Sequence, residues 1–152
     1  MNPRTGAFAF TALGVALLAS VGGCGKQDDG PKTHPVSGNV VVKNGDVKKL
    51  VGGSVRFQSA TDPNLIGVGE IQEDGSFSIG TFIEGKPRGG LPEGEYRARV
   101  EPRGFDQWQE DGQPPLRKGD ILPKYLNYNT SGLKHTIKPG DNPITVEVEA
   151  RR

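Results

Sequence analysis

The sequence predicts a single all-β domain, built as a two-sheet sandwich of about seven strands. Glycine (23 residues) and proline (12 residues) are abundant, whereas aromatic residues make up only 7% of the chain. This composition is typical of short strands joined by tight turns. From Val36 onward, apolar residues recur at every second position, which is the strand pattern. After residue 24 no segment keeps a helical period with capping residues, so no helix is expected.

Seven segments carry this alternation, and turn residues separate them. Asn44-Gly45 predicts a tight turn and Asp74-Gly75 predicts a hairpin. A bend is expected at Gly67 or Gly69 within the third segment. The predicted strands are Val36–Val42, Val55–Phe57, Leu65–Ile71, Phe77–Ile79, Tyr96–Val100, Leu133–Ile137 and Ile144–Val148.

The N-terminus has the layout of a secretory signal peptide. Arg4 is followed by an uncharged run, whose apolar centre is Ala7–Leu18, and then by small residues. That centre is shorter than the roughly 20 apolar residues needed to span a bilayer. Residues 1–23 are therefore predicted to be a signal peptide that is removed on export.

The run Val21-Gly22-Gly23-Cys24 resembles the lipobox of bacterial lipoproteins. The resemblance implies cleavage before Cys24 and acylation of its thiol, which would anchor the protein in a membrane of the cell envelope. Gly25, which is not an aspartate, resembles an outer-membrane sorting signal and favours that membrane. The alternatives are a buried free thiol or an uncleaved membrane helix. Because this is the only cysteine, no intramolecular disulfide is expected.

Residues 24–35 are expected to form a flexible tether. From Gly25 to Pro35 there is no aliphatic or aromatic side chain, and His34 is expected to be solvated. Of 19 Lys and Arg residues only Arg4 precedes Cys24, and none of the 18 acidic residues does. The mature chain is therefore close to neutral, which argues against nucleic acid as a partner.

The strand and turn residues together resemble the carboxypeptidase regulatory-like domain. The resemblance implies a transthyretin-like (prealbumin-like) Greek-key β-sandwich over residues 36–150, without catalytic residues of its own. This chain departs from the family pattern in a long loop at residues 102–120. The residues that carry the resemblance are Val36-Ser37-Gly38-Asn39-Val40, Gly53-Ser54-Val55-Arg56-Phe57, Glu73-Asp74-Gly75-Ser76-Phe77, Leu91-Pro92-Glu93-Gly94-Glu95-Tyr96-Arg97-Ala98-Arg99-Val100, Leu122-Pro123-Lys124-Tyr125, Thr130-Ser131-Gly132-Leu133 and Lys138-Pro139-Gly140-Asp141-Asn142.

No set of nucleophile, base and acid can be assembled from the sequence, so no catalytic residue, metal ligand or cofactor is predicted. His135 alternates with apolar residues on a predicted strand, which is typical of a partly buried or edge histidine. Glu70, Glu73 and Asp74 could bind calcium through their oxygens. The alternative is that Asp74 is present because the turn requires it.

The long loop holds the candidate ligand-binding residues, because it contains aromatic residues that the predicted sandwich does not require. Phe105 and Trp108, the only tryptophan, are interleaved with amides and acids, a pattern typical of sugar- or peptide-binding surfaces. The alternative is that Trp108 caps an open end of the sandwich. The sequence therefore predicts an anchored, non-catalytic binding or structural module at the cell surface or in the periplasm, for which carbohydrate and peptide are the candidate ligands. The alternative function is an accessory subunit that docks on an envelope enzyme or transporter.

Overall fold

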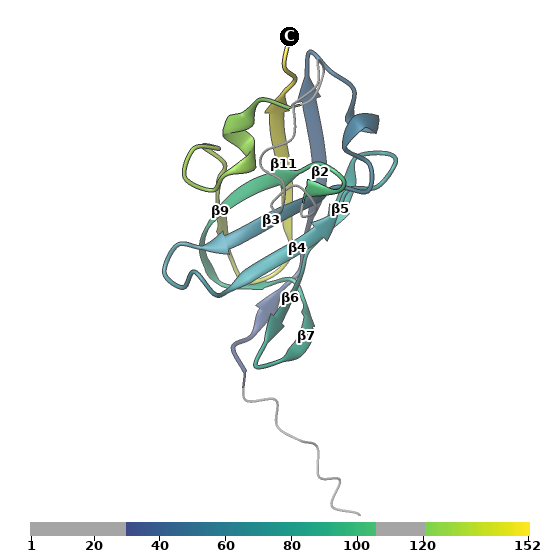
Figure 1. Cartoon of the computed structure of the whole chain (residues 1–152). Coiled ribbons are helices and arrows are strands. Elements are labelled where there is room, and N and C mark those ends of the chain that lie inside the picture. The colour runs from purple at the N-terminus through teal and green to yellow at the C-terminus, as the bar shows by residue number, and fades with distance from the viewer. Residues whose placement is uncertain (1–29, 106–120) are drawn as a thin grey trace, which may run out of the picture.

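The computed structural model describes residues 30–105 and 121–152, and it confirms the all-β class (Figure 1). The described helices are two 3-10 helices of four residues, η1 (Val47–Leu50) and η3 (Pro123–Leu126). No helix in these ranges is long and apolar enough to cross a membrane. The strands are β1 (Thr33–His34), β2 (Val36–Lys43), β3 (Ser54–Ser59), β4 (Ile66–Glu70), β5 (Ser76–Ser78), β6 (Gly80–Ile83), β7 (Lys86–Gly89), β8 (Leu91–Pro92), β9 (Gly94–Glu101), β10 (Lys134–Ile137) and β11 (Asn142–Glu149).

Most of these strands belong to two sheets. The larger sheet has the order β10-β9-β3-β4-β6-β7, and every neighbouring pair in it is antiparallel. The smaller sheet has the order β11-β2-β5. In it β2 pairs with β5 in the antiparallel sense, but β11 runs parallel to β2. The remaining two strands, β1 and β8, form a short pair of their own.

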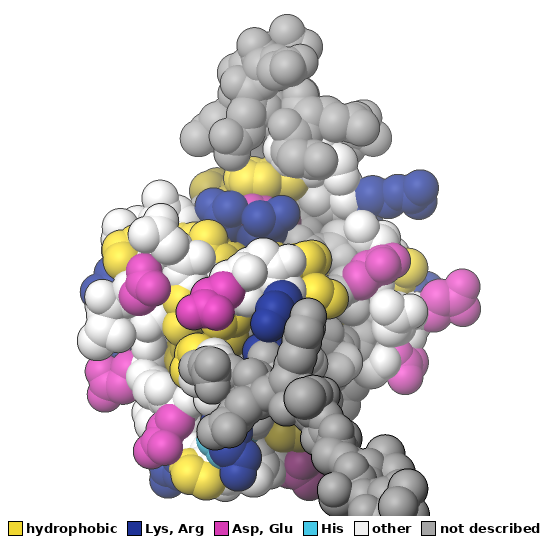
Figure 2. Space-filling view, turned by 90° about the horizontal axis from the view of Figure 1, so that it is seen from below, with side chains coloured by type: hydrophobic (Ala, Val, Ile, Leu, Met, Phe, Trp, Pro, Cys, Tyr) yellow, Lys and Arg dark blue, Asp and Glu magenta, His cyan; other side chains and the backbone are white. Residues whose placement is uncertain are grey.

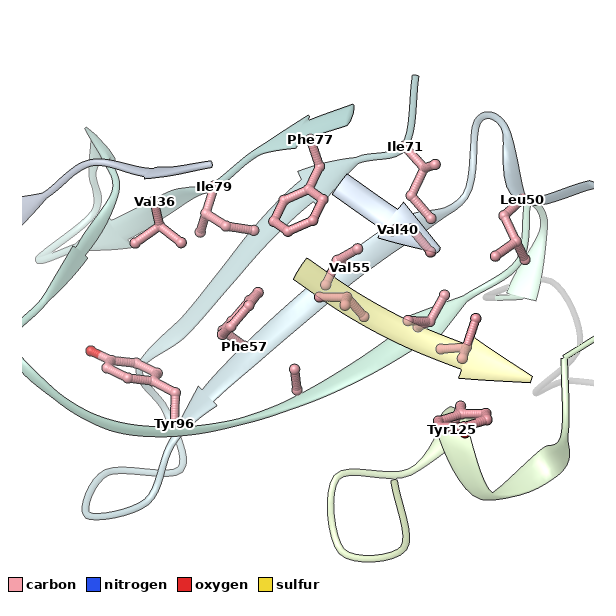
Figure 3. Close-up of a cluster of buried hydrophobic side chains, with 14 of the residues drawn as sticks. Val36, Val40, Leu50, Val55, Phe57, Ile71, Phe77, Ile79, Tyr96 and Tyr125 are labelled. Atoms are coloured by element: carbon pink, nitrogen blue, oxygen red, sulfur yellow. The ribbon is translucent and has the colours of Figure 1, made fainter. Parts of the chain in front are cut away.

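One hydrophobic cluster joins the inward faces of both sheets (Figure 3). Val40 comes from the smaller sheet, and Val55 and Phe57 from the larger. Tyr96 lies in the same cluster, and its hydroxyl donates a hydrogen bond to the Pro92 carbonyl at 3.0 Å. Burial raises the pKa of Tyr96 to about 12. The Greek-key, transthyretin-like type of the sandwich stays a prediction.

Each of the seven predicted strand segments contains a strand, but the Phe77–Ile79 segment is divided between the sheets. Phe77 lies in β5, which pairs with β2, whereas β6 begins after Ile79 and pairs with β4. Ile79 stands at the crossing, where its N–H donates to the Val36 carbonyl at 2.9 Å. Both side chains are buried, so the alternation continues through the crossing and conceals it. The hairpin β6–β7 that follows was not predicted.

The two predicted turns exist, but neither joins neighbouring strands of one sheet. Asp74-Gly75 lies between β4 and β5, which belong to different sheets, so the hairpin prediction is wrong there. Gly75 has a φ of +82°, as a tight turn requires. Asn44, with a φ of +59°, leads from β2 into η1. Both turns therefore carry the chain toward the other sheet.

Gly67 is on the inward face of β4, where the core leaves no room for a side chain. A Cβ there would lie 2.6 Å from both Ile79 Cγ2 and Leu91 Cδ2. The glycine thus lets two large apolar residues approach the strand backbone closely.

The folded part begins earlier than predicted, so the proposed tether is wrong at its C-terminal end. Thr33 and His34 pair with Pro92 and Leu91, and His34 is 6% exposed instead of solvated. The Nδ1 atom of His34 accepts a hydrogen bond from the Gly140 N–H at 3.1 Å. The ring nitrogens of a histidine can be hydrogen-bonded inside a pair of strands. The presence of His34 was therefore not evidence for a solvent-exposed segment.

Candidate functional site

Phe105 is the predicted ligand-binding residue that the structure describes. It follows β9 through a turn in which its N–H donates to the Pro102 carbonyl at 3.1 Å. Its half-buried ring lies against Arg99, whose guanidinium carbon is 5.8 Å from the ring centroid. Trp108 lies outside the described residues. So do Cys24 and the predicted cleavage residues Val21, Gly22 and Gly23.

Arg99 belongs to a partly buried cluster of charges on the outer side of the larger sheet. The antiparallel register of β3 and β9 places Arg56 opposite Arg99, and Ser54 opposite Glu101. Two like charges therefore face each other, and Glu101 contacts both of them. Arg56 Nε lies 2.6 Å from Glu101 Oε2, and Arg99 Nη2 forms an ion pair with Glu101 Oε1. Ser54 Oγ donates to Glu101 Oε2 at 3.3 Å. We call these four residues the arginine–glutamate cluster.

Glu101 is the most protected member of the arginine–glutamate cluster. Its side chain is 7% exposed, against 22% for Arg99 and 34% for Arg56. A buried carboxylate requires compensating charge and hydrogen bonds, and here two guanidinium groups supply them. Since two positive charges share one negative charge, the cluster keeps one positive charge in excess. An anionic or strongly polar ligand group would complement that charge.

Aromatic rings lie on Arg99 from two segments of the chain. Besides Phe105, Tyr128 stacks on it, with its ring centroid 4.7 Å from the guanidinium carbon. Burial raises the pKa of Tyr128, and the positive charge of Arg99 opposes that rise. Nearby, Ser131 Oγ donates to the Ala98 carbonyl at 2.6 Å, which holds the segment after η3 against β9. Arg99 is thus fixed by ion pairing and by cation–π contact.

A small cavity of about 110 Å³ adjoins the arginine–glutamate cluster. Its charged lining comes from Arg56, Glu101 and Arg103, and Gly52 and Gly53 form part of its wall. A Cβ at Gly53 would lie 2.4 Å from the Glu101 carbonyl oxygen, so the backbones approach closely there. This volume is below that of drug-sized ligand sites, and it suits one small group of a larger ligand, such as a carboxylate.

No protein-family model matches the chain, and no curated protein matches it. Among solved structures, the chain is similar to the crystal structure of a DUF3823 family protein from Parabacteroides merdae ATCC 43184, with a TM-score of 0.43 and 17% sequence identity. The similarity covers 78% of this chain and 46% of that one. This chain therefore spans less than half the length of that protein.

His135 occupies the position that its sequence pattern predicts, a partly buried place on an end strand of the larger sheet. Its ring packs on Phe57, with ring centroids 5.4 Å apart. Burial lowers the pKa of His135, and within the described part of the chain its Nε2 atom has no hydrogen-bond partner. The neutral ring thus packs at the edge of the hydrophobic core.

The Asp74 turn uses its carboxylate for its own backbone. Asp74 Oδ1 accepts a hydrogen bond from the Ser76 N–H at 2.9 Å, and hydrogen bonds from Ser76 lower the pKa of Asp74. Glu70 and Glu73 are exposed. Within residues 30–105 and 121–152, no group of three or more His, Cys, Asp or Glu side chains could hold a metal ion.

Sequence reasoning missed the arginine–glutamate cluster. Arg99 and Glu101 alternate with Ala98 and Val100, so an outward direction follows from the period. Their burial depends on Arg56 of β3, whose register against β9 cannot be read from either strand alone. The available signal was a glutamate two positions from an arginine on a strand that ends at a long loop.

Proposed function

We propose that the protein is an exported lipoprotein, anchored through lipid on Cys24 in the cell envelope, with the outer membrane favoured. Its folded part is a non-catalytic binding module of the transthyretin-like, Greek-key type, related to carboxypeptidase regulatory-like domains. The all-β class and the two sheets that share one core support this fold type. The lipobox pattern at Val21–Cys24 supports the anchor.

The observation that carries the binding function is the position of Arg99. Its guanidinium is ion-paired with Glu101 and lies against the rings of Phe105 and Tyr128. Carbohydrate and peptide sites combine aromatic faces with a few fixed polar groups in this way. The excess positive charge favours a ligand that carries a carboxylate, such as an acidic sugar or a peptide with an acidic side chain.

The histidine positions support a non-catalytic function. After Cys24 the chain has two histidines. His34 accepts a backbone hydrogen bond between two strands, and His135 packs on Phe57. Each therefore has a structural contact that accounts for its place.

Binding can be tested through the fluorescence of Trp108, which follows Phe105 by three positions in the sequence. Titration of the mature protein with uronic-acid oligosaccharides and acidic peptides is expected to shift its emission. We expect Trp108→Ala to abolish the signal and Arg99→Gln to weaken binding at least tenfold. Arg97→Gln, an exposed change on the same strand, should leave binding unchanged. Unchanged emission across both ligand panels would count against the binding module.

The anchor is tested separately with Cys24→Ala. The variant has no thiol to acylate, so unprocessed precursor is expected to accumulate. Mass spectrometry of the wild-type protein should show acyl chains on Cys24. Normal cleavage and normal membrane retention of the variant would contradict the lipoprotein proposal.

The accessory-subunit function is favoured by the end strand β10. Among the described strands β10 pairs only with β9, so its other edge can accept a strand from a partner. Recovery of one stoichiometric partner from detergent-solubilised envelope, lost when Thr136→Pro disrupts that edge, would support this function. No such partner would leave the binding module as the proposal.

A further inference from the structure

The hairpin β6–β7 carries the most exposed large apolar side chain in the described part of the chain. Phe82 is 72% exposed, against 44% for Val41 and 39% for Val68. The two central residues of its turn, Glu84 and Gly85, have φ values of +52° and +75°. Positive φ at both positions matches the right-handed twist of the paired strands, so the hairpin is a well-formed unit. At this exposure the Phe82 ring is available to contact a surface outside the chain.

The chain enters the fold against this hairpin. A Cβ on Gly30, the first described residue, would lie 3.2 Å from Arg88 Nη2 and 3.6 Å from Ile83 Cγ2. Figure 1 shows the hairpin at one end of the molecule and the C-terminus at the other. The point where the N-terminal segment joins the fold is therefore fixed beside β6 and β7.

The length of chain before Gly30 limits how far this end can be from an anchor on Cys24. Gly30 lies six positions after Cys24 in the sequence. A fully extended chain spans at most about 3.6 Å per residue, so the distance is at most about 22 Å. A lipid-bearing Cys24 would hold the hairpin end within this distance of the bilayer surface.

The chemistry of the hairpin suits a bilayer surface. Phe82 is the exposed aromatic group, and Glu84, Lys86 and Arg88 lie on the same hairpin. Seen from this end, apolar side chains lie among both basic and acidic ones (Figure 2). Aromatic side chains favour the membrane–water interface, where the ring enters the headgroup region.

We propose that the β6–β7 hairpin rests on the anchoring membrane, with Phe82 inserted among the lipid headgroups. This inference rests on the proposed lipid anchor. It makes Phe82 a second membrane contact beside the acyl chains, and it sets the orientation of the domain. In Figure 1, η1, which ends two positions before Gly52 of the cavity, lies in the half of the molecule away from the hairpin. The arginine–glutamate cluster would then face away from the bilayer.

The test uses the full lipidated protein in vesicles of phosphatidylethanolamine and phosphatidylglycerol. Acylation occupies the thiol of Cys24, so a cysteine introduced by Phe82→Cys is the only free thiol and can carry a nitroxide label. Val41→Cys and Val68→Cys are matched controls at other exposed apolar positions. The collision rate with a water-soluble nickel complex is measured for each label. We expect a collision rate at position 82 that is at least about threefold below both controls. A label that is inserted among the lipid headgroups is shielded from the water-soluble nickel complex.

Each other outcome has a defined meaning. Equal nickel collision rates at all three positions, in protein that floats with the vesicles and carries acyl chains on Cys24, would overturn the membrane contact while the anchor stands. Protein that lacks acyl chains and does not float would overturn the anchor itself. Dipolar broadening at position 82 that disappears on dilution with unlabelled protein would overturn the proposal in favour of a second copy as the occupant.

Discussion

The outer faces of the two sheets use charge in different ways. On the smaller sheet, Lys43 of β2 and Glu147 of β11 form an ion pair at 2.5 Å, with both side chains more than half exposed. On the larger sheet, Glu101 is buried between Arg56 and Arg99. The first pair is screened by water and contributes little to stability. The second is protected from solvent, so its loss leaves buried charge without a partner.

The outer face of the smaller sheet is therefore solvated, whereas charged side chains on the outer face of the larger sheet are held in fixed positions. Alternating polar residues on β11 need no fixed partner, because water satisfies them. Arg99, in contrast, has one carboxylate contact and two aromatic contacts, which fix its position before any ligand arrives. A group held in place in advance loses less conformational entropy on binding. For this reason the larger sheet carries the candidate site.

The largest expected effect is that of Glu101→Gln. The substitution leaves two arginines facing each other without the shared carboxylate, so we expect the free energy of unfolding to fall by about 3 kcal/mol. Urea denaturation of wild type and variant measures the change. Adding Arg99→Gln to the variant should restore part of the loss, because the remaining positive charges no longer repel. A loss below about 1 kcal/mol would mean that the cluster is solvated like the exposed pair.

His135 should make the larger sheet sensitive to acid. Its pKa is lowered in the folded protein from the ordinary value of 6.5, so below that pH the unfolded chain binds a proton that the folded chain does not. The stabilising contribution is complete above pH 6.5 and declines as the pH falls toward the folded pKa. The slope is at most about 1.4 kcal/mol per pH unit. We expect His135→Gln to reduce the slope of the free energy of unfolding against pH between pH 7 and about pH 5. The same slope in the variant and the wild type would contradict this prediction.

The ring of Tyr128 tests how much the stacking on Arg99 contributes. Tyr128→Leu removes the ring and keeps an apolar side chain, so a loss of about 1 kcal/mol is expected from the cation–π contact. Tyr128→Phe keeps the ring and should lose less. Thermal unfolding of the two variants side by side separates the ring from the hydroxyl. Equal losses would assign the effect to the hydroxyl instead.

The smallest effect is expected on the smaller sheet. Glu147→Gln breaks the exposed pair with Lys43, and we expect the free energy of unfolding to change by less than about 0.5 kcal/mol. The change should shrink further in high salt, which screens exposed charges. A loss comparable to that of Glu101→Gln would remove the distinction between the two faces.

Alternation predicted the long strands well, because one face of each is buried in a common core. Val55 and Phe57 of β3, and Tyr96 and Val100 of β9, all lie in that core as their spacing indicates. The same rule failed at Ile79, since period two continues when a chain passes from one sheet to the next. It also overlooked Thr33–His34, where two residues are too few to show a period.

The candidate site was only partly predictable. Phe105 was identified because an aromatic residue in a long, polar loop exceeds what the fold requires. Arg56 and Glu101 were not, because an outward charge is solvated unless a neighbouring strand brings its partner. That pairing depends on register, which involves residues far apart in the sequence.

The parallel pairing of β2 and β11 has a consequence for how the chain folds. Asn142 pairs with Val36 and Glu149 with Lys43, so the first long strand of the domain is completed by the last. Contacts between such distant segments form slowly, because nearly the whole intervening chain must be closed into a loop. During synthesis β2 has no partner on this edge until the C-terminus emerges. A chain shortened before Asn142 would leave that edge of β2 open to pairing with other molecules.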